Sequence, residues 1–303
     1  MRFQHSYHHR PVLLKESVEN LITDKNGIYV DATFGDGGHS FSILKQLNQK
    51  GIVIAIDQDK ESIKRNFIHD KRLHLFHKNF IHIYDILNKN HIKKVSGILI
   101  DLGVSSLQIK NPERGFSNQL NCYLDMRMNQ DSSYSAQNVL NESSKEKLFR
   151  IFSEYGEFNN VSKIVKKILN RRIKKKITTT LDLINIFFIR GSFKKKKRFF
   201  ARLFQSIRIE VNNEINILND FLLKSSKILI KGGRMSVISY HSLEDRIIKN
   251  FFKKGILIKN NKNNFLNPIP FRMMHKKVIK PSFEEITENP RSRSARLRIA
   301  EKY

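Results

Sequence analysis

The stretch Ile28 to His39 reads I-Y-V-D-A-T-F-G-D-G-G-H and decides the fold class of this chain. An apolar run breaks into a glycine-rich turn, and the next apolar run, I-V-I-A-I-D, ends on Asp57. This order is typical of the first half of a nucleotide-binding α/β unit. In such a unit, glycines let the ligand approach the backbone and a carboxylate accepts hydrogen bonds from its ribose.

The glycine pattern limits the kind of nucleotide that this unit can bind. A dinucleotide fingerprint that starts at Gly35 and Gly37 needs a third glycine at position 40, where the chain has Ser40. This disfavours a nicotinamide-dependent oxidoreductase. The Gly-Lys-Ser/Thr signature of a phosphate-binding loop is absent from the sequence. The residues favour a ligand with a ribose but no pyrophosphate, and S-adenosylmethionine is the common one.

Three predicted strands end in an aspartate, namely Asp31, Asp57 and Asp101. Strand and helix patterns alternate over this part of the chain, which predicts a parallel sheet with helices on both faces. Because the carboxyl ends of parallel strands meet at the ligand edge, we expect these carboxylates to lie together there. Asp59 is a weaker alternative to Asp57 as the ribose ligand, because it lies past the end of its strand.

The residue pattern changes after about Asn118, where helical periodicity continues without a strand signal. We therefore predict a discontinuous α/β core, residues 1–117 and 205–303, that carries an all-helical insertion, residues 118–204. The insertion is a candidate substrate-recognition domain. One long helix is expected over residues 200–228, ended by a glycine pair at 232–233.

Local signals predict where several helices begin and how the last strand is oriented. Ser143, Thr180 and Ser242 are the expected helix N-caps, the first through a capping box with Glu146. The last strand alternates apolar residues with Arg296 and Arg298, so its arginines are expected to point outward on an edge strand.

The charge of the chain indicates a polyanionic partner. Among its 303 residues, 56 are basic and 28 acidic, for a formal net charge of +28. Such an excess favours binding to nucleic acid or, alternatively, to an acidic membrane surface. A second interpretation assigns much of the lysine excess to an AT-biased coding sequence.

Other composition signals exclude several classes of site and location. The single cysteine, Cys122, cannot form an internal disulfide or a cysteine-based metal site, and no metal is expected. The N-terminal residues have no apolar region typical of a secretory signal, and no apolar run reaches the ~18 residues that span a bilayer. We therefore expect a cytoplasmic protein without a membrane partner.

Nine segments match the conserved segments of one family in the same order. They are H-R-P-V-L-L-K-E-S-V (9–18), D-A-T-F-G-D-G-G-H-S (31–40), A-I-D-Q-D (55–59), G-I-L-I-D-L-G-V-S-S-L-Q (97–108), E-R-G-F-S (113–117), L-D-M-R-M (124–128), F-Q-S-I-R-I-E-V-N (204–212), G-G-R-M-S-V-I-S-Y-H-S-L-E-D-R (232–246) and N-P-R-S-R-S-A-R-L-R (289–298). On these segments the chain resembles the RsmH (MraW) family of bacterial ribosomal RNA small-subunit methyltransferases.

The resemblance implies a class I (Rossmann-like) S-adenosylmethionine methyltransferase core with an inserted helical domain. It implies N4-methylation of a cytosine in 16S ribosomal RNA near the decoding centre, with the small ribosomal subunit as partner. A homodimer is a further option. The cofactor contacts that it carries over fall on Gly37, Gly38, His39, Asp57, Phe80, Asp101 and Gln108. For Phe80 the expected role is stacking on adenine, and the alternative is a core aromatic.

The exocyclic N4 of cytosine is a poor nucleophile, because its lone pair is delocalised into the ring, so it needs a hydrogen-bond acceptor. The Asp/Asn/Ser-Pro-Pro-aromatic turn that often supplies this acceptor is replaced here by D-L-G-V-S-S, residues 101–106. Asp101 is our first candidate, for cofactor orientation and for proton acceptance. Ser105, His241 and Asp245 are further candidates at the pocket rim. His241 is equally well explained as a helix cap or core residue, and Asp245 as a partner of the helix dipole.

Four basic tracts could contact RNA phosphates: residues 163–176, 194–198, 272–280 and 291–298. The last is expected to bind RNA, whereas the first forms one helix face whose contact with RNA is left open. Two alternatives to an rRNA methyltransferase remain. A non-catalytic, basic RNA-binding or ribosome-assembly factor would have lost cofactor binding, and a methyltransferase for proteins or small molecules would leave the charge unexplained.

Overall fold

The computed structural model describes residues 11–259, 262–266 and 268–303. His9 and Arg10 of the first matching segment therefore lie outside the described residues. The chain forms two compact units. The core unit consists of the chain up to Gly103 together with Asn216–Tyr303, and the helical unit consists of Val104–Ile215. The predicted insertion, residues 118–204, falls within the helical unit, and its role in substrate recognition stays a prediction.

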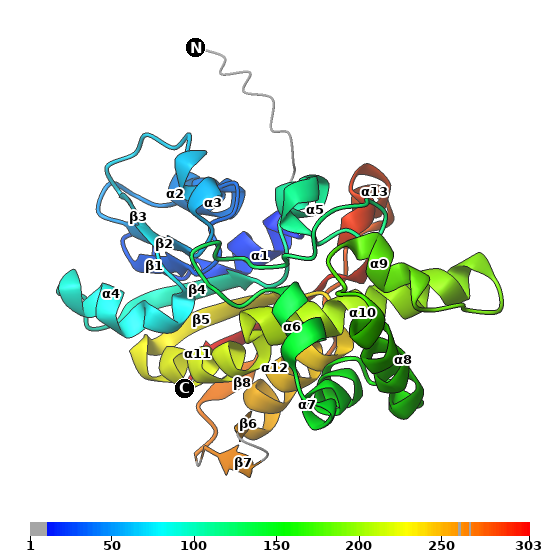
Figure 1. The fold of residues 1–303 in the computed structure, drawn as a ribbon. Helices are drawn as coiled ribbons and strands as arrows, with labels where there is room; N and C mark the ends of the chain where they lie inside the picture. Colours follow the sequence, from blue (N-terminus) through cyan, green and yellow to red (C-terminus); the bar gives the residue numbers. More distant parts are fainter. Residues whose placement is uncertain (1–10, 260–261, 267) are drawn as a thin grey trace. The chain divides into compact units, whose positions relative to one another are not determined.

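The core unit is built on a seven-stranded sheet with the order β3-β2-β1-β4-β5-β9-β8 (Figure 1). Strands β1 to β5 are parallel; at one end β9 pairs antiparallel with β5, and β8 pairs antiparallel with β9. This arrangement confirms the predicted α/β class. The strands are β1 Ile28–Asp31, β2 Ile52–Asp57, β3 Leu73–His77, β4 Val95–Asp101, β5 Leu229–Ser239, β8 Phe271–Met273 and β9 Arg296–Lys302.

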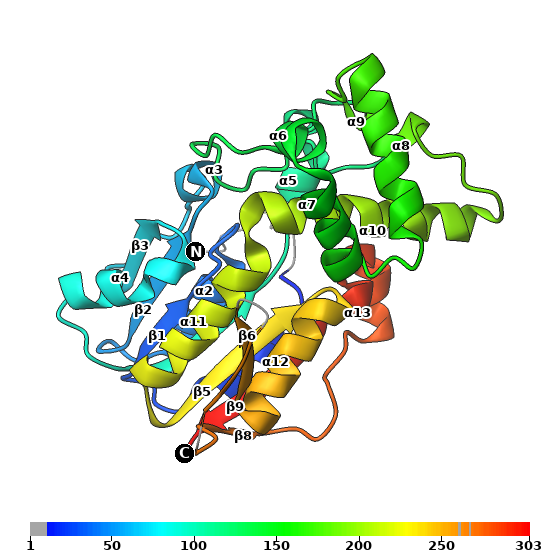
Figure 2. The ribbon, with the colours of Figure 1, turned by 60° about the horizontal axis from the view of Figure 1, so that its bottom comes forward.

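Helices cover both faces of this sheet. Helices α1 and α2 lie on one face and α4, α11 and α12 on the other (Figures 1 and 2). The apolar stripe of α1 and α2 packs on the buried residues of β1, β2 and β4, which form one hydrophobic cluster. The helices are α1 Leu14–Leu21, α2 Gly38–Gln46, α3 Lys60–Lys64, α4 Ile83–Lys89, α11 Glu214–Ile228, α12 Ser242–Lys254 and α13 Phe283–Glu288.

Two 3-10 turns and one hairpin complete the core unit. The turns are η1 Phe80–His82 and η4 Pro290–Ser294, and the hairpin pairs β6 Ile256–Lys259 with β7 Lys262–Phe265. No helix within the described residues is long and apolar enough to cross a membrane.

The order of the strands reverses direction between β1 and β4, which lie side by side although β2 and β3 separate them in sequence. In open α/β sheets, ligands bind beyond the carboxyl ends of the strands at such a switch point. Asp31, Asp57 and Asp101 are the last residues of β1, β2 and β4. The predicted placement of three aspartates at one sheet edge is therefore confirmed.

The helical unit contains no β-strand among its residues, all of which the structure describes. Its core includes Leu140, Leu148, Phe152, Ile168 and Leu203, each fully buried. The helices are α5 Ser106–Lys110, α6 Ala136–Glu142, α7 Lys145–Arg150, α8 Val161–Lys174, α9 Thr180–Asn185 and α10 Phe193–Asn212, with the 3-10 turn η2 Pro112–Arg114 and the π-helical turn η3 Ile151–Tyr155.

The prediction of one long helix over residues 200–228 is wrong. The chain forms α10 and α11 instead, separated at Asn213, whose φ of 51° is left-handed. The glycine pair at 232–233 lies inside β5, not at a helix end. The pairing of β5 with β4 shifts between Val95 and Gly97, so the glycines form an irregularity in the strand.

The predicted N-cap is wrong by one residue at three helices: the cap is Ser144 instead of Ser143, Thr179 instead of Thr180, and His241 instead of Ser242. At α7, for example, Ser144 Oγ accepts a hydrogen bond from Lys147 N at 3.1 Å. In each case the neighbouring residue also has a side chain that can cap, so the sequence signal does not separate the two.

The last strand differs from its prediction in position and in side-chain direction. Strand β9 lies between β5 and β8 and is not an edge strand. Arg298 is only 8% exposed and forms an ion pair with Asp245, so it does not point outward toward solvent. The prediction of a row of outward arginines on an edge strand is therefore wrong.

Candidate functional site

The turn between β1 and α2 requires glycine at two positions. Gly35 and Gly37 have φ values of 55° and 79°, which L side chains rarely adopt. A Cβ on Gly37 would lie 2.8 Å from Phe34 Cζ, and one on Gly38 would lie 2.1 Å from Pro11 Cγ. The absence of a Cβ at Gly37 and Gly38 therefore lets the loop pack closely against Phe34 and Pro11.

Asp57 is tied to this loop by its carboxylate. Oδ2 accepts a hydrogen bond from Gly35 N at 2.7 Å, and Oδ1 accepts one from Asp59 N at 2.8 Å. Each carboxylate oxygen can accept a further bond, so Asp57 has capacity for two ribose hydroxyls. Asp59, the alternative ligand, accepts from Glu61 N at 3.1 Å and caps α3, which favours Asp57 for the ribose.

Asp31 holds the start of the glycine loop. Its Oδ2 accepts from Ser40 Oγ at 2.6 Å, and its Oδ1 accepts from Thr33 N at 3.2 Å. Ser40, which replaces the third glycine of a dinucleotide fingerprint, thus has its own structural role here. Asp31 is fully buried, and this burial raises its pKa to about 7.

Asp101 is hydrogen-bonded to Tyr240, the residue that follows β5. The tyrosine hydroxyl donates to Asp101 Oδ1 at 2.9 Å, and Asp101 N donates to Thr33 Oγ1 at 2.7 Å. Burial raises the pKa of Asp101 to about 8; the Tyr240 hydrogen bond lowers it, and the like charges of Asp31 and Glu244 add to the increase. This carboxyl is a stronger base than an exposed aspartate.

The sheet edge therefore carries three carboxyl groups whose pKa values are all raised, since burial also raises that of Asp57 to about 6. A cation bound nearby would stabilise their ionised forms, whereas a pyrophosphate would add like charge. S-adenosylmethionine carries a ribose, a sulfonium and an ammonium. The acceptor at Asp57 and the acidic sheet edge fit these groups.

Two of the expected cofactor residues are engaged in packing. His39 is buried and its Nε2 donates to the Val12 carbonyl at 3.2 Å; burial lowers the pKa of its imidazole to about 4, so the ring is neutral at pH 7. Phe80 begins η1 and contacts Phe221 edge-on, with ring centroids 4.9 Å apart. Its ring is half-buried, which leaves part of it for a stacking contact.

His241 and Glu244 form the N-terminus of α12. His241 Nδ1 accepts from Glu244 N at 3.3 Å, and Glu244 Oε2 accepts from Tyr240 N at 2.9 Å. His241 Nε2 lies 3.1 Å from Glu244 Oε1 but makes no hydrogen bond among the described residues. The interpretation of His241 as a helix cap is thus confirmed. The buried Glu244 forms the capping box with it.

Asp245, another candidate, is held in a salt bridge between α12 and β9. Its carboxylate accepts from Arg298 Nε at 2.7 Å, from Arg298 Nη2 at 3.1 Å and from Arg296 Nη1 at 3.1 Å. The bidentate ion pair with Arg298 is buried. This geometry gives Asp245 a structural task that accounts for its position.

Ser105 and Gln108 belong to the helical unit and form the capping box of α5. Ser105 Oγ accepts from Gln108 N at 3.1 Å, and Gln108 Oε1 accepts from Ser105 N at 3.0 Å. The remaining predicted residues, Asp101 and His241 among them, belong to the core unit.

Two residues of the core site were not expected from the sequence. Tyr240 and Glu244 connect Asp101 to the start of α12. Both stand in the segment Y-H-S-L-E, in which the pair His241 and Glu244 has capping-box spacing. Histidine is a rare cap, so this signal is easily read as a cap at Ser242.

Comparisons with known proteins identify the family of this chain. The sequence model of the family described as "MraW methylase family" matches residues 6–303. A "Ribosomal RNA small subunit methyltransferase H" of Karelsulcia muelleri is 48% identical over 301 residues, covering 97% of this chain and 98% of the relative. Proteins of the same name from Flavobacterium psychrophilum and Caldicellulosiruptor saccharolyticus are 46% and 47% identical, and cover 96% and 98% of this chain and 100% and 99% of their own lengths.

Proposed function

Since this chain belongs to the MraW methylase family, we propose that it transfers a methyl group from S-adenosylmethionine to small-subunit ribosomal RNA. The acceptor that we propose is N4 of a cytosine in 16S rRNA. The observation that carries the proposal is the sheet edge where Asp57 joins the glycine loop and Asp101 ends the neighbouring parallel strand. The alternative of a non-catalytic RNA-binding factor is not favoured, because it leaves this site without a task.

The proposed cofactor residues follow from the contacts in the core unit. Asp57 would accept hydrogen bonds from the ribose, and the backbone of Gly37 and Gly38 would lie along the ligand. Phe80 would stack on the adenine. Bound S-adenosylmethionine supplies an electrophilic methyl group on its sulfonium. The protein then has to hold the acceptor amine in line with it and exclude water.

We assign the acceptor role for the amine to Asp101. In its ionised form, this carboxylate can accept a hydrogen bond from N4 and localise the nitrogen lone pair for attack. Tyr240 holds the carboxylate by its hydrogen bond to Oδ1 and leaves Oδ2 for the amine. His241 and Ser105 remain secondary candidates. Asp245 is the weakest, because Arg298 and Arg296 already engage its carboxylate.

The RNA partner is supported by the charge and by the helical unit. A net charge of +28 provides the counterpart for phosphates, and the helical unit holds the tracts at residues 163–176 and 194–198. We propose that this unit recognises the RNA, in agreement with a cytoplasmic enzyme that acts on ribosomal subunits.

Methyl transfer can be tested with methyl-labelled S-adenosylmethionine and small ribosomal subunits from cells that lack this modification. We expect label on N4 of a single cytosine of 16S rRNA. We also expect Asp101→Asn to lose most of the rate of methyl transfer. A protein that binds S-adenosylmethionine but leaves all subunit RNA unlabelled would support the non-catalytic alternative.

A further inference from the structure

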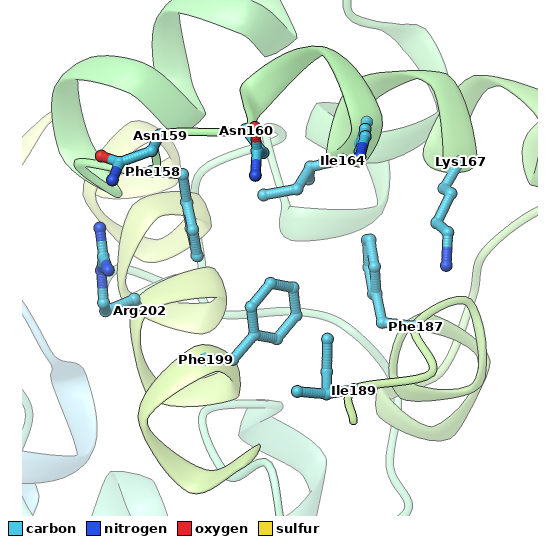
Figure 3. A pocket seen from close by; sticks show the side chains of 10 residues that line it. Phe158, Asn159, Asn160, Ile164, Lys167, Phe187, Ile189, Phe199 and Arg202 are labelled. Atoms are coloured by element: carbon cyan, nitrogen blue, oxygen red, sulfur yellow. The ribbon is translucent and has the colours of Figure 1, made fainter. Parts of the chain in front are cut away.

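The helical unit has a hollow that the cofactor site does not involve. It has a volume of about 330 Å³ and is lined by α8, α10, the segment between η3 and α8, and the segment after α9 (Figure 3). Three phenylalanines contribute to its wall: Phe158, Phe187 and Phe199. A second hollow of about 590 Å³ shares Phe158 and Phe199 with it, so the two form one surface that we call the aromatic pocket.

The aromatic rings of this pocket are only partly covered. The ring centroid of Phe199 lies 5.3 Å from those of Phe158 and Phe187, with interplanar angles of 57° and 59°. Phe187 is buried, Phe158 and Phe199 are half-buried, and the neighbouring Phe188 is 77% exposed. The fully buried core of the helical unit lies elsewhere, at residues such as Phe152. The open rings thus offer a face to a flat, apolar group.

The rim of the aromatic pocket is positively charged. None of its described lining residues is acidic, and six are basic: Lys163, Lys167, Arg190, Lys195, Arg198 and Arg202. The guanidinium of Arg202 lies 4.5 Å from the Phe158 ring centroid and donates to the backbone carbonyls of Gly156, at 2.8 Å, and Glu157. Lys167 Nζ lies 5.7 Å from the Phe187 ring centroid.

Asn159 and Asn160 add amide groups at the same rim (Figure 3). Amides can both donate to and accept from the polar edge of a base. Open aromatic rings, cations and amides are the combination by which proteins hold unpaired bases and their phosphates. An acidic peptide would use the cations and amides but not the aromatic rings, so an RNA is the better fit.

We propose that the aromatic pocket binds an unpaired nucleotide of RNA, additional to the base that is methylated. The base lies against Phe158 and Phe199, and the flanking phosphates contact Lys163, Lys167 and Arg202. This deepens the proposed function, on which it rests for the identity of the RNA: the pocket is a second point at which the substrate is held.

The charge component can be tested with the full chain and a fluorescein-labelled oligoadenylate of eight nucleotides, by fluorescence anisotropy. We expect Lys163→Gln with Lys167→Gln to weaken binding roughly tenfold, because two phosphate contacts are lost. The matched control, Lys174→Gln with Lys176→Gln, removes the same charge from exposed positions outside the pocket and should change affinity less than threefold. Equal losses in the two double variants would overturn the proposal.

The stacking component is tested with Phe199→Leu and with an abasic oligomer of the same length. We expect the unmodified protein to bind the oligoadenylate roughly tenfold more tightly than the abasic oligomer, and Phe199→Leu to abolish this preference. Phe158→Leu is a second variant with the same expected result. For both variants, an unchanged affinity for S-adenosylmethionine and an unchanged melting temperature show that the fold is intact. Equal binding of both oligomers by the unmodified protein, or equal competition by polyglutamate, would overturn the proposal.

These measurements do not require methyl transfer. A protein that binds RNA through the pocket but methylates no subunit RNA would contradict the proposed function alone. The rate of 16S rRNA methylation at limiting RNA can also be compared between the unmodified protein and the variant with Lys163→Gln and Lys167→Gln. Equal rates would contradict the proposed role of the aromatic pocket alone.

Discussion

At the scale of single residues, the site depends on carboxyl groups that are costly to bury. Asp31, Asp57 and Asp101 each end a strand, and burial raises the pKa of all three. Their hydrogen bonds to backbone amides, Ser40 and Tyr240 only partly offset this burial. A cationic ligand would further stabilise the ionised carboxylates, so these residues suit a sulfonium.

The pH dependence of stability should reveal Asp101. Its carboxyl stays protonated up to about pH 8 in the folded protein, whereas in the unfolded chain it ionises near the ordinary value of 3.8. The folded state therefore binds more protons between these values, and the free energy of unfolding falls as pH rises, by up to about 1.4 kcal/mol per pH unit. In Asp101→Asn this fall should be shallower, as measured by urea unfolding from pH 5 to 8. An unchanged slope would contradict the burial of this group.

Asp245 should matter for stability more than for cofactor binding. Asp245→Asn leaves the buried Arg298 guanidinium without its carboxylate, and breaking a buried pair in this way lowers the free energy of unfolding by about 2–4 kcal/mol. Chemical unfolding at pH 7 measures the loss, and titration with S-adenosylmethionine should show less than a threefold change in affinity. Full stability together with lost methyl transfer would instead restore Asp245 as a catalytic candidate.

The sequence predicted the carboxyl groups well and their partners poorly. Glycine turns and strand-ending acids are local patterns, so Asp31, Asp57 and Asp101 could be placed at one edge without a structure. The bond from Tyr240 to Asp101 joins residues that are distant in the chain, and the ion pair of Asp245 with Arg298 joins α12 to β9. No local pattern reports such contacts.

At the scale of elements, the break between α10 and α11 is the largest departure from the expected fold. Apolar residues keep helical spacing on both sides of Asn213, so periodicity alone predicts one helix. The left-handed φ of 51° at Asn213 ends α10, and α11 begins at Glu214. Asparagine tolerates this conformation better than most residues do. A single asparagine within a helical pattern does not, however, predict a break by itself.

A pair of substitutions tests this break. Asn213→Gly should keep or slightly raise stability, because glycine adopts the left-handed region without a steric penalty. Asn213→Val should lower the free energy of unfolding by about 1–2 kcal/mol, because a β-branched side chain is strained there. Thermal unfolding of the two variants checks the order. If valine were tolerated as well as glycine, a continuous helix would be the better description.

At the scale of the whole molecule, two compact units divide the chemistry. The core unit holds the glycine loop and the three strand-ending carboxyl groups, and the helical unit holds the aromatic pocket with its basic rim. The alternation of strands and helices, and the later purely helical pattern, predicted an insertion over residues 118–204, whereas the helical unit spans Val104–Ile215. The outward direction of Arg296 and Arg298 on an edge strand was predicted wrongly, because local pattern does not reveal the position of a strand in the sheet. The contact of residues 291–298 with RNA stays a prediction.

The most direct measurement is a calorimetric titration of S-adenosylmethionine into the unmodified protein, Asp57→Ala and Asp59→Asn. We expect Asp57→Ala to lose at least tenfold in affinity, because the ribose hydroxyls lose their acceptor. Asp59→Asn, which can still cap α3, should bind as the unmodified protein does, and both variants should keep their affinity for RNA. Undiminished binding of S-adenosylmethionine by Asp57→Ala would contradict the placement of the cofactor at this sheet edge.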